Sequence, residues 1–285
     1  MVVSRADLRA IRGFVFDVDG TLILSESPDW SGAVPLPGAV ELLDWLRARG
    51  YPFALFTSGS TYRPETYAAR LRAAGLPIED WQVITTGVTA AEIIATDYPG
   101  RSVYVLGEEG TIAPLQARGI RVVDGTEGET AGVVLVGWSR ALTYDQLDIA
   151  CRAVWNGADL LVTSAARAFV SKRGLKPGWS WSIAIAIAET TGKRPRVVGK
   201  PSVEALRAVA RLLGTDVASL AVVGDDPDLE LRMGRDAGAL TIQVRTGRGS
   251  EPIETPVIGD LVLSGVEELF ALLQEIHAKE GAADQ

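Results

Sequence analysis

The stretch that most constrains the fold of this chain is the apolar run Gly13–Phe16, which is followed at once by Asp17 and Asp19. Such a run is typical of a strand buried on both faces of a parallel sheet. Gly20 ends the strand, which puts Asp17 at its carboxyl end and Asp19 on the loop beyond. Open α/β sheets bind their ligands at that edge. Two carboxylates so close together need a cation or a shared proton, and a solvated Asp–Gly turn is the alternative.

Strand and helix patterns alternate after this stretch. A helix pattern covers residues 38–49, Phe53–Phe56 is a second buried run, and Pro64 opens the next helix. The alternation returns near the C-terminus with apolar runs at 219–223 and 240–244, separated by a helix pattern. Because β-α-β crossovers are right-handed, this order predicts an α/β fold with a Rossmann-like, doubly wound parallel sheet.

The middle of the chain has an alternation of its own. Strand patterns lie at 103–106, 120–123, 133–136 and 160–163, with helix patterns at 144–155 and 181–190. These elements are enough for an independent α/β core. We therefore expect a core domain formed by residues 1–82 and 195–285, and an inserted α/β cap domain formed by residues 83–194.

Composition excludes several classes of function. A net charge of −8 over 285 residues argues against a surface for nucleic acid or for an anionic membrane. Cys151 is the single cysteine and lies in a helix pattern, which predicts a small core residue in a reducing, cytoplasmic setting. The single histidine, His277, excludes Ser-His-Asp and Cys-His catalysis and histidine-rich zinc sites. Carboxylates, lysine and hydroxyl groups must supply any chemistry.

Reactive side chains follow four of the predicted strands. They are Asp17 and Asp19, Thr57 and Ser58, Lys200, and Asp225 and Asp226. In a doubly wound sheet, such strand ends converge on one crevice. Hard oxygen ligands without histidine favour Mg²⁺. A carboxylate can attack phosphorus, a second can act as acid and then as base, and lysine and hydroxyl donors can hold the phosphoryl oxygens.

Four segments resemble, in order, the motifs of the haloacid dehalogenase superfamily of phosphatases. They are Asp17-Val18-Asp19-Gly20-Thr21, Phe56-Thr57-Ser58, Gly199-Lys200-Pro201-Ser202 and Val222-Val223-Gly224-Asp225-Asp226. The order, with a domain inserted between the second and third motifs, is similar to subfamily IIA, the NagD-like or 4-nitrophenylphosphatase-like group. The resemblance covers nearly the whole chain. It implies a Mg²⁺-dependent phosphoric monoester hydrolase that acts on a small phosphorylated metabolite.

The resemblance also implies roles for individual residues. Asp17 would be the nucleophile and Asp19 the acid and base. Asp17, the backbone carbonyl of Asp19, and Asp225 would bind Mg²⁺. The phosphoryl group would be held by Thr57, Ser58 and Lys200.

The chain departs from the family pattern at several positions. Ser58 stands where members usually carry asparagine, and Glu230 replaces an aspartate five residues after Asp225. Asp226 and Glu230 are therefore both candidates to bind the metal or to orient its ligands. Residues 163–166 read Thr-Ser-Ala-Ala where relatives often show Thr-Asn-Pro-Asp, so the identity of the individual substrate cannot be carried over. The loop at 25–34 is several residues longer than usual.

The inserted domain supplies the candidates for substrate contact. Trp179 and Trp181 follow a segment rich in arginine and lysine, and we expect them to form an aromatic wall. The alternative is that both rings pack inside the cap, beneath the isoleucines of 183–187. An oligomer of identical chains joined through the cap is compatible with either interpretation.

Two other functions fit the same fold. One is a non-catalytic or regulatory protein, against which the presence of Asp17, Asp19, Lys200 and Asp225 weighs. The other is a phosphotransferase, which would pass the phosphoryl group from Asp17 to an alcohol instead of water. Both reactions use the same aspartyl-phosphate intermediate, so product analysis with added acceptor alcohols distinguishes the phosphotransferase from the hydrolase.

Overall fold

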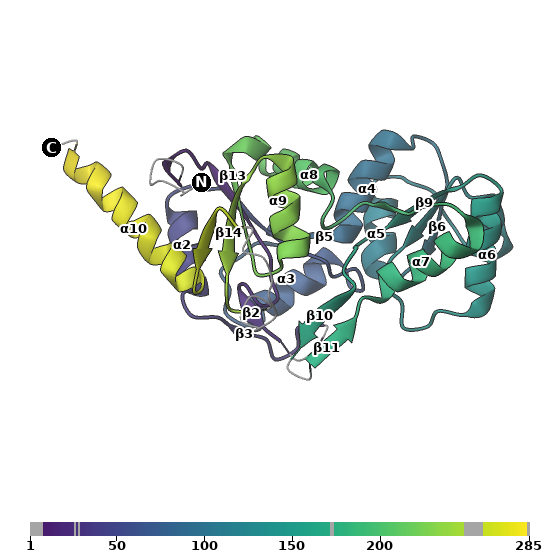
Figure 1. Cartoon of the computed structure of the whole chain (residues 1–285), viewed down its shortest axis with the longest axis horizontal. Coiled ribbons are helices and arrows are strands. Elements are labelled where there is room, and N and C mark those ends of the chain that lie inside the picture. The colour runs from purple at the N-terminus through teal and green to yellow at the C-terminus, as the bar shows by residue number, and fades with distance from the viewer. Residues whose placement is uncertain (1–7, 26, 28, 172–173, 248–258, 284–285) are drawn as a thin grey trace. The chain divides into compact units, whose positions relative to one another are not determined.

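The computed structural model describes residues 8–25, 27, 29–171, 174–247 and 259–283 (Figure 1). The chain forms two compact units. The first unit consists of Met1–Phe56, Ala68–Val83 and Val209–Gln285, and the second of Thr57–Tyr67 and Ile84–Ala208. Among the described residues, no helix is both long enough and apolar enough to span a membrane.

A six-stranded sheet organises the first unit. Its strand order is β15 (Leu261–Leu263), β14 (Leu240–Val244), β13 (Leu220–Gly224), β1 (Gly13–Phe16), β4 (Phe53–Thr57) and β5 (Val83–Thr85). β1 pairs in parallel with β13 and with β4, and β14 pairs in parallel with β13 and β15. The predicted α/β fold with a parallel, doubly wound core sheet is therefore confirmed.

The central strands are the ones that the sequence predicts. Every residue of β1, β4 and β13 is buried, as expected for strands covered on both faces. The edge strands β5 and β15 were not predicted, because each has only three residues and shows no usable periodicity.

The helices of the first unit come from distant parts of the chain. They are α2 (Ala39–Ala48), α9 (Arg232–Ala237) and α10 (Val266–Ala283), with parts of α3 (Pro64–Ala73) and α8 (Val203–Leu213). Helix α10 packs against α2, where the ring of Trp45 meets the edge of Phe270. A two-residue antiparallel pair, β2 (Ile23–Leu24) with β3 (Val34–Pro35), closes the base of the loop between β1 and α2.

The second unit has its own five-stranded parallel sheet, which confirms the inserted α/β cap fold. Its strand order is β12 (Arg196–Val197), β9 (Asp159–Val162), β8 (Val133–Val136), β6 (Val103–Leu106) and β7 (Val122–Val123). The helices are α4 (Thr86–Asp97), α5 (Glu109–Ala117), α6 (Tyr144–Trp155) and α7 (Trp179–Thr191). Figure 1 shows α6 and α7, which contact each other, on the same side of this sheet.

Neighbouring residues along the strands of the second sheet belong to two separate hydrophobic clusters. Tyr104, Val134 and Leu160 pack with residues of α6 and α7. Their neighbours along the strands, such as Val133 and Leu161, pack with residues of α4 and α5. Because side chains alternate between the faces of a strand, both faces are apolar and both are covered by helices.

Two features of the second unit differ from the sequence prediction. β10 (Ala168–Ser171) and β11 (Gly174–Pro177) form an antiparallel pair within a segment where no strand was expected. β12 pairs with β9 in the second sheet, so Lys200 does not follow a strand of the core sheet as the sequence suggested. The sequence does place Lys200 at the end of a strand, but the partner of that strand is a long-range property that a local pattern does not contain.

Candidate active site

Two of the predicted carboxylates follow adjacent strands of the core sheet. Asp17 comes directly after β1 and Asp225 directly after β13, and Phe16 lies opposite Val223 in the parallel register. The amide of Asp17 continues the ladder by donating to the carbonyl of Val223 over 2.8 Å. The register therefore brings both carboxylates to the carboxyl edge of the sheet, where α/β proteins bind ligands.

A third carboxylate completes an acidic cluster at this edge. Carboxylate oxygens of Asp17, Asp225 and Glu230 all lie within 4.8 Å of one another. Asp225 is 6% exposed and Glu230 2% exposed. Buried like charges at such separations are unfavourable unless a cation or a proton compensates them. Three convergent hard oxygen donors fit a divalent cation of the Mg²⁺ class.

The turn after β13 places Glu230 in the cluster. The backbone amide of Asp226 donates to Oε1 of Glu230 over 2.8 Å. The carboxylate of Asp226 instead accepts from the amide of Asp228 over 2.9 Å and caps the short helical segment Pro227–Leu231. Of the two candidates near Asp225, the structure brings Glu230 to the cluster, while Asp226 holds the turn.

Glycines allow the backbone to approach the Asp225 carboxylate closely. Gly20 has φ +81°, and a Cβ there would lie 2.8 Å from Oδ2 of Asp225. A Cβ at Gly247 would overlap the same oxygen. The hydroxyl of Thr246 donates to the carbonyl of Gly20 over 2.6 Å, and that of Thr21 lies 3.4 Å from Oδ1 of Asp225. Only glycine fits the two positions beside this carboxylate.

Asp19 lies on the turn just beyond β1 and is exposed. The carbonyl of Val18 accepts the amides of Thr21, Leu22 and Ile23 at 3.3, 3.0 and 3.1 Å and so fixes the turn. Oδ2 of Asp19 accepts a hydrogen bond from the indole Nε1 of Trp30 over 2.7 Å. A carboxylate that is exposed yet oriented is suited to exchange protons with a substrate.

The predicted phosphate-binding residues belong to the second unit. Thr57 is the last residue of β4, is buried, and accepts the amide of Gly59 on Oγ1 over 3.0 Å. The carbonyl of Ser58 accepts from the hydroxyl of Thr86 at 3.4 Å. These bonds fix the backbone of the loop that follows β4, the neighbour of β1 in the core sheet.

Lys200 is also in the second unit and is 1% exposed. Its carbonyl accepts the amide of Ala165 over 3.0 Å, which ties it to the loop after β9. A lysine ammonium is among the groups least often buried completely, because desolvation of its charge is costly unless an anion or acceptor compensates it. The burial of Lys200 therefore requires that anionic or acceptor groups compensate the charge of its ammonium group.

The two tryptophans proposed to contact substrate differ in their surroundings. Trp179 is 51% exposed at the first residue of α7. Trp181 is partly buried and packs against the hydrophobic cluster that α6 and α7 form with the second sheet. The packing alternative therefore describes Trp181, while Trp179 keeps an accessible ring.

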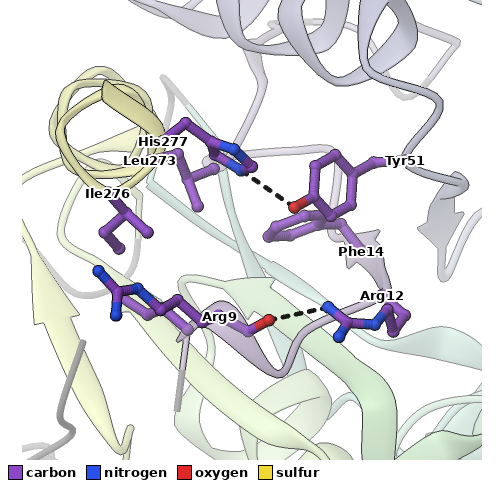
Figure 2. A pocket seen from close by; sticks show the side chains of 8 residues that line it. Arg9, Arg12, Phe14, Tyr51, Leu273, Ile276 and His277 are labelled. Carbon is purple, nitrogen blue, oxygen red and sulfur yellow. Dashed lines mark hydrogen bonds between the residues drawn. The ribbon is translucent and has the colours of Figure 1, made fainter. Parts of the chain in front are cut away.

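A cavity of about 260 Å³ lies elsewhere in the first unit (Figure 2). Its lining consists of Leu8, Arg9, Arg12, Phe14, Tyr51, Leu273, Ile276 and His277. The hydroxyl of Tyr51 and Nε2 of His277 are 3.0 Å apart, as Figure 2 shows. Phe14 is the second residue of β1, so the cavity lies toward the amino edge of the sheet, away from Asp17. No carboxylate is among its eight lining residues.

Cys151 packs against the second unit's hydrophobic cluster, as expected for a core residue. Burial, with a smaller contribution from the charge of Asp148, raises the pKa of its thiol above the usual value. A raised pKa disfavours the thiolate, which is the nucleophilic form. The structure therefore gives no support to cysteine chemistry.

Sequence reasoning missed two contributors to the site. Nothing in the local pattern indicates that the indole of Trp30 bonds to Asp19 across eleven positions. Gly247 was likewise unrecognised, although a glycine just after a predicted strand is a signal for close backbone approach. Both contacts depend on how loops fold back over the sheet edge.

Two family models match the chain. A model for haloacid dehalogenase-like hydrolases matches residues 14–121, and a second model for HAD-like hydrolases matches residues 197–269. The first match contains Asp17 and Asp19, and the second contains Lys200, Asp225 and Glu230. The segment between the two matches lies in the second unit.

Curated relatives cover most of the chain. The chain is 32% identical to the 5′-nucleotidase YutF of Bacillus subtilis over 240 residues. These residues cover 84% of this chain and 89% of that protein. The chain is 30% identical over 240 residues to the acid sugar phosphatase of Staphylococcus aureus, with 84% and 88% covered.

Solved structures share the whole fold. The 4-nitrophenylphosphatase of Thermotoga maritima matches with a TM-score of 0.82 and 28% identity, over 94% of this chain and 99% of that one. NagD from Escherichia coli matches with a TM-score of 0.79 and 26% identity, over 90% and 98%.

Proposed function

This chain belongs to the haloacid dehalogenase-like hydrolases as a phosphatase of the NagD-like subfamily IIA, and from this premise we propose that it is a Mg²⁺-dependent hydrolase of small phosphate monoesters. The observation that carries the proposal is the cluster of Asp17, Asp225 and Glu230, whose oxygens converge at the carboxyl edge of the core sheet. A site built from carboxylates suits phosphoryl transfer because positive charge bound there offsets the charge of the phosphate.

The first half of the proposed reaction transfers the phosphoryl group to the protein. A carboxylate oxygen of Asp17 attacks phosphorus while the bond from phosphorus to the leaving oxygen breaks. The carboxyl group of Asp19 donates its proton to that oxygen, so the alcohol departs neutral. An aspartyl-phosphate remains on Asp17, and Asp19 is now ionised.

The second half returns the protein to its starting state. The ionised Asp19 takes a proton from a water molecule, whose oxygen attacks the phosphorus of the aspartyl-phosphate. The bond to Asp17 breaks, inorganic phosphate leaves, and Asp19 has regained its proton. Over the whole cycle Asp19 gives up one proton and regains one, and Asp17 gains and then loses the phosphoryl group.

The remaining site residues are assigned to binding. We assign Thr57, Ser58 and Lys200 to the oxygens of the phosphoryl group, as hydrogen-bond donors and as a positive charge. Mg²⁺ would be held by Asp17, Asp225, Glu230 and the backbone carbonyl of Asp19, and it supplies positive charge beside the phosphate when bound. The second unit is assigned the role of the domain that determines substrate specificity.

The substrate class is proposed from the relatives. A 5′-nucleotidase and an acid sugar phosphatase are among the curated proteins that the chain resembles. Both names describe phosphate esters of small polar molecules. A nucleoside monophosphate or a sugar phosphate is therefore the class of substrate that we propose.

Turnover of p-nitrophenyl phosphate tests the proposal. We expect hydrolysis that requires Mg²⁺, stops with a chelator and is lost in Asp17→Asn. A panel of nucleoside monophosphates and sugar phosphates, assayed for released phosphate, then identifies the preferred class. Absence of turnover with every ester would support the regulatory alternative. Transfer of phosphate to added alcohols in preference to water would identify a phosphotransferase.

A further inference from the structure

The indole of Trp30 reaches the site from the loop between β2 and β3. Ile23 pairs with Pro35 and Leu24 with Val34, so the loop leaves and returns through a closed base. Trp30 is 3% exposed, although it belongs to no helix or strand. A large ring buried at the tip of a polar loop indicates a fixed position.

The backbone at Trp30 adopts a left-handed conformation with φ 59°. This conformation is unfavourable for a bulky side chain and persists only where the surroundings determine it. The amide of Trp30 donates to the carbonyl of Ser27 over 2.9 Å, and its carbonyl accepts from Ala33 over 3.1 Å. The hydrogen bonds of the loop therefore hold the backbone at Trp30 in an unfavourable conformation, and this fixes where the indole lies.

Asp29, the residue before Trp30, anchors the loop to helix α3. A nitrogen of the Arg70 guanidinium donates to the carbonyl of Asp29 over 2.5 Å, and another lies 3.3 Å from its Oδ2. Ser27 donates its hydroxyl to the same carboxylate. Charge-assisted bonds of this kind are geometrically specific. They fix the backbone next to Trp30 from the side facing α3.

The anchored indole uses its single N–H group to donate a hydrogen bond to Asp19. Nε1 of Trp30 lies 2.7 Å from Oδ2 of Asp19. An indole nitrogen donates and cannot accept, so this oxygen acts as an acceptor in the bond. The bond therefore holds Oδ2 toward the indole and fixes the orientation of the carboxylate. The bond thus distinguishes the two oxygens of an otherwise exposed carboxylate.

We propose that Trp30 is a positioning residue for the acid–base step, which it serves by fixing Asp19 so that Oδ1 delivers and recovers the proton. The inference rests on the proposed function, because it assumes that Asp19 protonates the leaving oxygen. A misplaced proton donor slows reactions that need protonation and matters little where the leaving group departs readily as an anion.

Two aryl phosphates make the proposal testable without knowledge of the natural substrate. p-Nitrophenolate leaves readily without protonation, whereas phenolate is a poorer leaving group. Their esters differ only by a nitro group. The ratio of kcat/KM for p-nitrophenyl phosphate to kcat/KM for phenyl phosphate therefore reports how well the acid works.

Trp30→Phe keeps an aromatic ring and removes the N–H donor. We expect the ratio to rise about tenfold, through a loss on phenyl phosphate, because general acid catalysis contributes about 10²–10⁴ and misorientation forfeits part of it. Trp45→Phe is the matched control in the same unit and should leave the ratio unchanged. Asp19→Asn sets the upper limit of the effect.

If Trp30→Phe fails to fold, benzothienylalanine can replace Trp30 instead. This residue exchanges the N–H for sulfur in a ring of nearly the same shape. An equal loss on both esters in either variant would make Trp30 a purely structural residue and overturn the inference. Unchanged kcat/KM values for both esters would overturn it as well. Failure of the unsubstituted protein to hydrolyse either ester would instead refute the proposed phosphatase activity.

Discussion

The backbone amide of Asp226 lies 2.8 Å from Oε1 of Glu230, and this bond selects which acidic residue joins Asp17 and Asp225. The carboxylate of Asp226 is turned to the amide of Asp228 instead. Two residues that the sequence leaves as equal candidates thus have different roles. One supplies an oxygen to the acidic cluster, and the other shapes the turn that carries it.

Glu230→Gln should weaken metal binding without unfolding the turn. The glutamine Oε1 can still accept from Asp226, but the negative charge is lost. We expect the Mg²⁺ concentration for half-maximal activity to rise about 10–100-fold, the usual effect of altering groups around a metal site. Asp226→Asn is the matched control and should leave this concentration unchanged. The opposite pattern would assign the metal to Asp226.

Asp17→Asn should abolish turnover because an amide does not attack phosphorus. We expect kcat to fall by several orders of magnitude. The melting temperature should stay the same or rise, since Asp17 lies within 4.8 Å of two other carboxylates and its removal relieves repulsion. Asp228→Asn, at an exposed carboxylate nearby, should keep full activity. More than about a tenth of normal activity in Asp17→Asn would refute its role as nucleophile.

Lys200→Met should lower kcat/KM about 10²–10³-fold, the scale for losing one preorganised electrostatic donor. Methionine roughly preserves the apolar length of the buried side chain, so a loss of activity can be separated from unfolding by measuring the melting temperature. Lys193→Met is the control, because Lys193 forms an exposed ion pair with Asp159 at 2.9 Å. Equal activity of the two variants would make Lys200 a structural residue.

Trp179→Ala and Trp181→Ala form a matched pair that separates substrate contact from packing. Trp181 packs against a hydrophobic cluster, so its truncation should cost up to about 3 kcal/mol of unfolding free energy. Trp179 is half exposed, and its loss should change stability by less than about 0.5 kcal/mol. If Trp179 contacts substrate, its variant raises KM more than it lowers kcat. An unchanged KM would end that assignment.

Asp29 should make a contribution to stability that disappears in acid. Hydrogen bonding from Ser27, aided by Ser31 and the charge of Arg70, lowers the pKa of Asp29 from 3.8 to about 2 against the opposing effect of burial. A lowered pKa in the folded state stabilises the protein above the unfolded value, and this contribution is lost as the pH falls. The difference in melting temperature between the unsubstituted protein and Asp29→Asn should therefore be constant above about pH 4 and shrink toward pH 2. A constant difference throughout would mean that the carboxylate charge of Asp29 contributes nothing.

The amino-acid sequence determined the central strands and the identity of the reactive groups. Buried runs such as Gly13–Phe16 and Leu220–Gly224 are recognisable because every residue is apolar, and a strand of that kind requires cover on both faces. The carboxylates that end these runs are equally visible. The alternation of strands and helices then predicts parallel strands, whose carboxyl ends lie at one edge of the sheet.

Tertiary structure alone decided which of these groups meet. The pairing of β12 with β9 removes Lys200 from the series of core strand ends, and the turn after β13 chooses Glu230 over Asp226. The bond from Trp30 to Asp19 also has no local signature. Each depends on contacts between segments far apart in the chain or on the path of an irregular loop. Local periodicity records which face of an element is buried, but it does not record what covers that face.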